Sequence, residues 1–384
     1  MQEDANLKMN SGYTFVDSAE GLAHLIKALR DATRVGVDTE ADSLHHYFEK
    51  VCLIQLSFLG THYIVDPLAG LSPAEFFEVL SRKELIFQGA DYDLRMLKKS
   101  FGFRPEAPIF DTMLAAQVLG YEKIGLAALA EKICGVSLPK GEQKADWSRR
   151  PLPAKLLSYA SNDTKYLEGI VSAQSGELQK LGRTAWHREC CERVVKISGL
   201  PDKNEAKEAW RIKGSSKAAP NALVFVRELW KWRDEEARRK DRPPFMILKN
   251  EDILELAEWR AKNPKTPLDG GPSFLKRFAG EIRARLERTI RFAENVPSAE
   301  WPGPPVRAAW PERVPEEKIE PLLAACKTLA DELRIEPCFL ASRAALTAVV
   351  QHQPKSIEKL MEVSGMMRWQ AELIMPALVL GSAK

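Results

Sequence analysis

Residues 35–41 read Val-Gly-Val-Asp-Thr-Glu-Ala, and the rest of the chain is organised around them. Valine and threonine alternate with glycine, aspartate and glutamate, a period of two that is typical of a β-strand. Asp38 and Glu40 therefore point to one face, although acidic residues are depleted in strands and neighbouring like charges raise each other's pKa. A hard divalent cation would relieve this repulsion because it prefers carboxylate oxygens. The alternative is a solvated pair at a strand end.

Composition and length describe a multi-domain globular protein. A chain of 384 residues with 45% hydrophobic and 28% charged residues predicts two or three domains. No apolar run reaches the roughly 18 residues that a membrane helix needs, and residues 1–10 lack the apolar core of a signal peptide. We therefore expect a cytoplasmic protein without a membrane partner. The six cysteines have no zinc-like spacing, which favours reduced and mostly buried thiols.

Charge is unevenly distributed along the chain. Residues 1–200 carry a net charge of −2 and residues 201–384 a net charge of +5. The excess is concentrated in residues 203–249, which contain 13 basic and 7 acidic side chains. Such a basic segment favours binding to phosphate backbones, and a solvated helical face is the alternative.

The order of apolar patterns predicts a mixed α/β layer over about the first 200 residues. Three β-rich runs at 35–41, 51–58 and 62–65 include a hairpin signal, so we expect consecutive antiparallel strands. Alternating helix and strand patterns over residues 73–120 then predict parallel strands with covering helices.

More acids follow at places where a sheet brings its strand ends together. Asp91 and Asp111 each precede a helical pattern, so we predict that both are N-caps. Asp93 then falls in a first helical turn, free to face the end of the sheet. Tyr159 and Asp163 are four residues apart and share one helical face.

These pieces together resemble the three motifs of the DEDD superfamily of 3′–5′ exonucleases, and among them most closely the ribonuclease D family. The resemblance covers about residues 10–200, with supporting matches at 53–56 and 146–152. Tyr159, four positions before Asp163, is typical of the tyrosine branch. Gln88 departs from the pattern, since relatives often have histidine there, which puts only a local substrate contact in doubt.

The resemblance implies a ribonuclease H-like mixed sheet and a site for two divalent ions, Mg²⁺ or Mn²⁺. Carried over by position, the ligands are Asp38, Glu40, Asp93 and Asp163, and Tyr159 orients the attacking water. Two ions about 3.5–4 Å apart suit phosphodiester hydrolysis. Tyrosine has an ordinary pKa near ~10, so a hydrogen-bonding role is more plausible than that of a full base.

The C-terminal half resembles nucleic-acid-binding helical modules. Residues 221–240 form an amphipathic helix whose Trp-Lys-Trp-Arg run resembles an HRDC domain, with Trp230 and Trp232 expected in or near its core. Residues 317–384 resemble a second, diverged copy. The basic residues that we expect to bind RNA are Arg227, Lys231, Arg238, Arg239 and Lys240. The predicted domains are an exonuclease at 1–205, HRDC modules at 215–295 and 317–384, and a proline-rich linker at 296–316.

We therefore expect a metal-dependent exoribonuclease that removes 5′-mononucleotides from RNA 3′ ends, by family analogy those of tRNA precursors. No protein partner is evident from the sequence. One alternative is a DNA 3′–5′ exonuclease of the Werner type, which shares these motifs. The other is a non-catalytic nucleic-acid-binding scaffold, which would not require four intact carboxylates.

Overall fold

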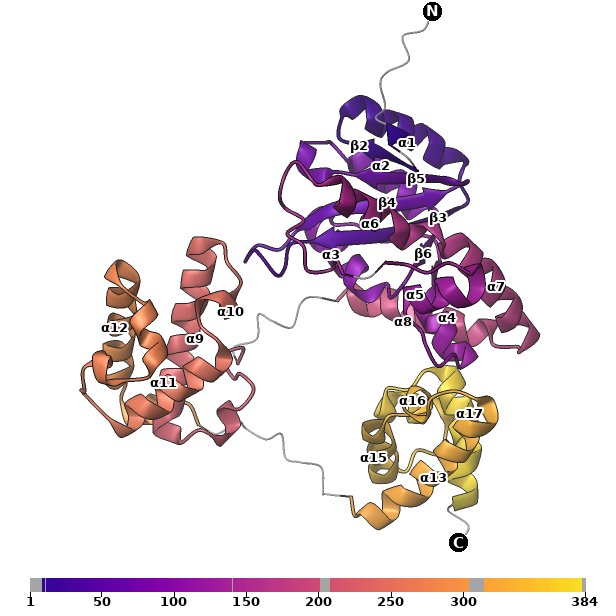
Figure 1. Ribbon diagram of the computed structural model, residues 1–384. Helices are drawn as coiled ribbons and strands as arrows, with labels where there is room; N and C mark the ends of the chain where they lie inside the picture. Colours follow the sequence, from indigo (N-terminus) through magenta and orange to yellow (C-terminus); the bar gives the residue numbers. More distant parts are fainter. Residues whose placement is uncertain (1–8, 11, 140, 201–207, 304–313, 382–384) are drawn as a thin grey trace, which may run out of the picture. The chain divides into compact units, whose positions relative to one another are not determined.

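The protein is described by a computed structural model that covers residues 9–10, 12–139, 141–200, 208–303 and 314–381 (Figure 1). The chain divides into two compact units. The first unit contains residues 1–41, 50–200 and 311–384, and the second contains residues 42–49 and 201–310. The domain boundaries predicted from the sequence stay predictions, and part of the predicted linker, 304–313, lies outside the described residues.

The first unit is built on a seven-stranded mixed sheet with the order β1-β2-β5-β4-β3-β6-β7. As the hairpin pattern predicts, β3, β4 and β5 are antiparallel neighbours. On the other side of β3, β6 and β7 pair in parallel, and β2 lies parallel to β5 at the opposite end of the sheet. The strands are β1 (Met9–Asn10), β2 (Tyr13–Val16), β3 (Arg34–Ala41), β4 (Val51–Phe58), β5 (Thr61–Val65), β6 (Glu84–Phe87) and β7 (Ile109–Asp111).

Helices cover both faces of this sheet. α1, α2, α3 and α8 bury apolar side chains on the face that carries Val35 and Val37. α4 and α7 pack on the opposite face, where α6 contacts β3, β4 and β5. Gly36 permits this close packing, because a Cβ atom there would lie 3.4 Å from the carbonyl oxygen of Thr164 on α6. The helices are α1 (Ala19–Asp31), α2 (Ala74–Ser81), α3 (Asp91–Phe101), α4 (Thr112–Leu119), α5 (Leu126–Leu129), α6 (Ala154–Lys165), α7 (Leu167–Lys180) and α8 (Thr184–Ser198).

The second unit is helical and has a core of its own. Trp232 is buried and Trp230 is half-buried, as their helical spacing predicts. Asp241 ends the long helix α9 in the left-handed conformation, with φ 46°, and Pro243 and Pro244 follow it. The helices are α9 (Pro220–Lys240), α10 (Pro244–Ile247), α11 (Asn250–Lys262) and α12 (Gly280–Glu294).

The C-terminal helices share a hydrophobic core with the helices beside the sheet in the first unit. The rings of Trp186 on α8 and Trp369 on α17 stack with their centroids 4.8 Å apart. Arg183 is buried and donates hydrogen bonds to the carbonyl oxygens of Val118 and Leu333. The helices are α13 (Glu316–Leu333), α14 (Pro337–Leu340), α15 (Arg343–His352), α16 (Ile357–Ser364) and α17 (Arg368–Gly381).

The predicted fold class, an α/β mixed-sheet domain followed by helical domains, is confirmed. All six cysteines are free thiols. Four are buried, Cys134 is half-buried and Cys338 is exposed, which agrees with the prediction of mostly buried, reduced cysteines. Within the described ranges, no helix is both long and apolar enough to cross a bilayer.

Candidate active site

Asp38 and Glu40 lie on the same face of β3, as the alternating pattern predicts. Val35 and Val37 point to the opposite face and are fully buried in the core under α1, α2 and α3. Because one face of β3 is fixed by this apolar core, the two carboxylates must face α6. The buried alternation of the strand therefore sets the direction of the acid pair.

Asp163 on α6 joins the acid pair from a distant part of the chain. One carboxylate oxygen from each of Asp38, Glu40 and Asp163 lies within 4.8 Å of the others. All three side chains are partly accessible to solvent. We call these three residues together with Asp93 the acid cluster.

Asp93 is held beside the acid pair by hydrogen bonds from Thr39 on β3. β6 ends at Phe87 while β3 continues to Ala41, so the later residues of β3 lack a β6 partner. Asp93, in the first turn of α3, accepts hydrogen bonds from the N–H of Thr39 at 3.0 Å and from its hydroxyl at 2.6 Å. These bonds place the buried Asp93 beside Asp38, although it lies outside the group of three oxygens within 4.8 Å. Sequence reasoning missed Thr39 because its position in the alternation assigns it to the apolar face.

Burial raises the pKa of every carboxyl group in the acid cluster and is the largest cause at each position. Repulsion by other members of the cluster adds to burial at Asp38, Glu40 and Asp163. At Asp93 the added repulsion comes from Asp111, and the hydrogen bonds from Thr39 oppose the rise. The pKa of Glu40 rises to about 9 and those of Asp93 and Asp163 to about 7, while the pKa of Asp38 is well above its ordinary value. Among the residues that the structure describes, none of the four has a salt-bridge partner. The cluster therefore brings together acids whose ionisation no cation of the described chain favours.

Tyr159 lies one helical turn before Asp163 and is half-buried. Its ring centroid is 6.3 Å from that of the buried Trp147, and Gln143 hydrogen-bonds its hydroxyl. Burial, followed by the charges of the nearby acids, raises the pKa of Tyr159 above its ordinary value. Gln143 had no distinguishing signal in the sequence, because it lies in a segment without regular structure.

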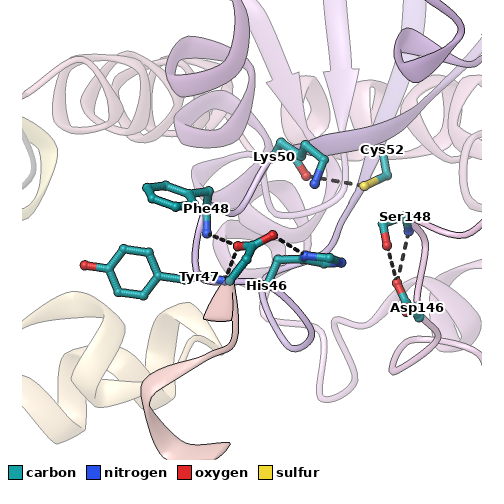
Figure 2. Close-up of polar contacts among 8 residues, drawn as sticks. His46, Tyr47, Phe48, Lys50, Cys52, Asp146 and Ser148 are labelled. Atoms are coloured by element: carbon teal, nitrogen blue, oxygen red, sulfur yellow. Dashed lines mark hydrogen bonds and ion pairs between the residues drawn. The ribbon is translucent and has the colours of Figure 1, made fainter. Parts of the chain in front are cut away.

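The segment before α6 is anchored by Arg150. Its guanidinium group pairs with both carboxylate oxygens of Asp66, at 2.5 and 2.7 Å, and donates to the carbonyl oxygen of Cys52 on β4. Nearby, Asp146 accepts hydrogen bonds from the N–H and the hydroxyl of Ser148 (Figure 2). Residues 146–152, which match the family pattern, therefore support α6. They hold this helix, with Tyr159 and Asp163, against the sheet.

The prediction that Asp91 is an N-cap is wrong, whereas Asp111 is one. The N-cap residue of α3 is Ala90, and Asp91 is the first helical residue, exposed and paired with Arg95. Asp111 accepts hydrogen bonds from two N–H groups of α4 and also from the N–H groups of Gly89 and Ala90. The carboxylate at the start of α4 thus also binds the two N–H groups that lead into α3.

Gln88, the departure from the family pattern, has a structural role. Its amide nitrogen donates to the carbonyl oxygen of Ile124 at 2.8 Å, and its oxygen accepts from the hydroxyl of Thr112 at 2.5 Å. Both ends of the amide are therefore bound by the protein itself.

The basic residues of α9 that were predicted to bind RNA are largely paired with acids. Arg227 and Lys231 both contact Glu228, and Arg239 contacts the buried Glu236. Arg238 contacts Asp234 and Tyr47, while Lys240 is exposed at the end of the helix. The structure brings Arg238, Arg239 and Lys240 together on the last turn of α9.

The segment that follows the acid pair is bound by the end of α9 within the second unit. Asp241 accepts hydrogen bonds from the N–H groups of Tyr47 and Phe48 at 3.0 and 3.1 Å and pairs with the ring of His46 at 2.7 Å (Figure 2). The hydrogen bond from His46 is the main reason why the pKa of Asp241 is lowered. Residues 42–49 are thereby attached to the helical module, which the sequence patterns did not predict.

Comparison with known proteins identifies the family. A model described as 3′–5′ exonuclease matches residues 13–175, and an HRDC domain model matches residues 222–267. A ribonuclease D from Nitrobacter hamburgensis is 32% identical over 290 residues, covering 73% of this chain and 75% of the relative. The chain belongs to the ribonuclease D family. A further ribonuclease D, from Pseudomonas paraeruginosa, is 28% identical over 338 residues, covering 86% of this chain and 87% of its own length.

The fold agrees with that of Escherichia coli RNase D, whose crystal structure is described as that of an exoribonuclease involved in structured RNA processing. The match has a TM-score of 0.71 and 23% identity, and covers 97% of this chain and 98% of that one. The predicted family and enzyme class are confirmed: this ribonuclease D family member is a 3′–5′ exoribonuclease, and its substrate class is nucleic acid.

Exonucleases of this kind use divalent metal ions, and the residues present fit such ions. The acid cluster offers hard oxygen donors, which Mg²⁺ and Mn²⁺ prefer. Its carboxylates also lack a charge partner among the described residues, so bound cations would remove the repulsion that raises their pKa values.

Proposed function

We propose that this ribonuclease D family member hydrolyses the terminal phosphodiester of RNA 3′ ends with two divalent ions held by Asp38, Glu40, Asp93 and Asp163. The observation that carries the proposal is the convergence of three carboxylate oxygens within 4.8 Å, without a balancing cation from the described chain. When bound, such ions shield the phosphate charge, activate water and stabilise the departing 3′ oxygen. The products are 5′-mononucleotides.

Tyr159 orients the attacking water in this proposal. Its pKa is raised, so the phenol keeps its proton at neutral pH and can donate a hydrogen bond. Gln143 and the ring of Trp147 restrict the position of the phenol. The position of Tyr159 one turn before Asp163 puts the hydroxyl on the side of α6 that faces the acid cluster.

The end of α9 supplies the RNA-binding charge that the proposal requires. Arg238, Arg239 and Lys240 are exposed and follow each other at the C-terminal turn. Phosphate contacts of this kind weaken steeply with salt. The relatives act on RNA, and structured RNA processing by the E. coli enzyme supports RNA 3′ ends, including those of tRNA precursors, as substrate.

Digestion of RNA labelled at either end tests the reaction. With 3′-labelled RNA we expect immediate release of labelled mononucleotide, and with 5′-labelled RNA a ladder of progressively shorter products, both abolished by a chelator. Release of the 5′ label as mononucleotide, or undiminished activity in chelator, would refute the proposal. A matched DNA oligonucleotide tests the alternative of a DNA exonuclease, because only the 2′-hydroxyl group and the thymine methyl distinguish the two.

A charge-neutral variant tests the RNA-binding surface in the full chain. Replacing Arg238, Arg239 and Lys240 with glutamine should raise KM for long RNA several-fold and flatten its salt dependence, while kcat on short oligomers stays unchanged. Lys359→Gln, at an exposed lysine on α16, is the matched control. An equal loss on long and short RNA would argue that the three residues support folding instead.

A further inference from the structure

Gln55 on β4 lies directly opposite Asp38 in the antiparallel pair of β3 and β4. Directly opposed residues of such a pair share one face of the sheet, with Cβ atoms roughly 4.5–5.5 Å apart. The side chain of Gln55 therefore lies on the face that carries the acid pair, which α6 covers. Gln55 comes from β4, a strand that supplies none of the four residues of the acid cluster.

The amide of Gln55 is completely buried, and neither its oxygen nor its nitrogen has a hydrogen-bond partner among the residues that the structure describes. Buried polar groups are normally paired, and an unpaired amide destabilises the fold. Two other glutamines of the first unit are hydrogen-bonded at one or both ends of the amide. Gln88 uses both ends, and the buried Gln174 donates to the carbonyl oxygen of Thr112 at 3.0 Å while its own oxygen has no partner among the described residues.

The neighbouring groups do not explain why a glutamine occupies this position. Leu53 is apolar, and the hydroxyl of Ser57 is already bound to His62 at 2.8 Å and to Thr164 at 2.6 Å. The indole N–H of Trp147 is also buried and has no partner within the described part of the chain, but it can only donate and so cannot accept from the amide nitrogen. On this face, the residue opposite Gln55 is Asp38, whose carboxylate is a strong acceptor.

We propose that Gln55 is a positioning residue for the acid cluster, whose amide N–H donates to the Asp38 carboxylate when that carboxylate binds a divalent ion. The inference rests on the proposed function. A carboxylate that binds an ion through one oxygen keeps lone pairs on its other oxygen, and these can accept this hydrogen bond. Hydrogen bonds to metal-ligating groups typically strengthen metal binding by about 10–100-fold.

Gln55→Met tests the proposal because methionine has a similar length and no group that can donate this hydrogen bond. We expect the melting temperature of the metal-free protein to rise or stay unchanged, since an unpaired amide is removed. The affinity for Mn²⁺, measured by calorimetry or electron paramagnetic resonance, should fall about tenfold. Activity on a short RNA should fall at limiting Mn²⁺ and recover at saturating Mn²⁺. Gln55→Leu is a second variant with the same expected outcome.

Gln174→Met is the matched control, because Gln174 is equally buried but bound to Thr112. We expect it to lower the melting temperature and leave Mn²⁺ affinity unchanged. Unchanged Mn²⁺ affinity in the two Gln55 variants would overturn the proposal. A loss of affinity together with a fall in metal-free melting temperature as large as that of Gln174→Met would also overturn it. Failure of the wild-type protein to bind Mn²⁺, or undiminished binding by Asp38→Asn, would instead refute the proposed function.

Discussion

Two groups of buried carboxylates in the first unit have opposite surroundings. Asp66 and Asp111 are almost fully buried, yet Arg150 binds both oxygens of Asp66 and four backbone N–H groups bind Asp111. The carboxylates of the acid cluster are partly or fully buried as well, but their charged neighbours are other acids. Burial therefore does not distinguish a functional carboxylate here; repulsion by neighbouring acids that no cation of the described residues balances does.

The difference has an energetic meaning. Removing a buried ion that is fully hydrogen-bonded destabilises the fold, because its partners are left unpaired. An ion that repels its neighbours destabilises the fold until a ligand cancels the charge. The two groups should consequently respond in opposite ways to substitution, to pH and to divalent ions.

The largest expected effect is the loss of activity when a carboxylate of the acid cluster is neutralised. Asp38→Asn and Asp163→Asn should each lower kcat at saturating Mn²⁺ by at least about 10³-fold, equivalent to roughly 4 kcal/mol of transition-state stabilisation. The metal-free melting temperature should be unchanged or higher, because a repelling charge is removed. Asp91→Asn, at an exposed acid on α3, is the control and should keep normal activity. Near-normal hydrolysis by Asp38→Asn would contradict the assignment.

The next largest effect is the loss of stability when a satisfied carboxylate is removed. Asp111→Ala leaves four backbone N–H groups without their acceptor, so we expect the free energy of unfolding to fall by about 3 kcal/mol. Chemical denaturation of the metal-free protein measures this change. A loss below about 1 kcal/mol would show that water replaces the carboxylate, and the contrast between the two groups would lose its basis.

A smaller effect is expected from pH in the metal-free protein. The raised pKa values mean that the folded state binds more protons than the unfolded state, in which carboxyl groups titrate near ~4. The stability that these bound protons contribute is fully present below pH ~4. It is lost as the pH rises through about 7, for Asp93 and Asp163, and through about 9, for Glu40. The melting temperature should fall from pH 6 to pH 9 without ions.

Saturating Mn²⁺ should remove most of this fall, because bound cations favour the ionised carboxylates. Asp163→Asn should reduce the fall in the metal-free protein. An identical pH dependence with and without Mn²⁺ would indicate that groups outside the acid cluster cause it.

The smallest effect is expected at Asp241, which is a satisfied carboxylate on the surface. Asp241→Asn keeps a residue type that tolerates φ 46° but removes the charge that faces His46. We expect the global free energy of unfolding to change by less than about 1 kcal/mol, since the pair is partly exposed to solvent. Hydrogen exchange at Tyr47 and Phe48 should nevertheless become faster. Unchanged exchange at both amides would mean that other contacts hold residues 42–49.

The sequence by itself determined the local features of this protein: the strand of Asp38 and Glu40, the hairpin, the helix of Tyr159 and Asp163, and the acids in family order. These follow from periods of two and 3.6 residues, which depend only on near neighbours in the chain. Only the tertiary structure decided that Ala90 and not Asp91 is the N-cap of α3, that Asp111 binds the entries of two helices, and that Thr39 holds Asp93. It also decided that Gln55 lies unpaired opposite Asp38. Such features depend on which distant segments pack together, and no local pattern contains that information.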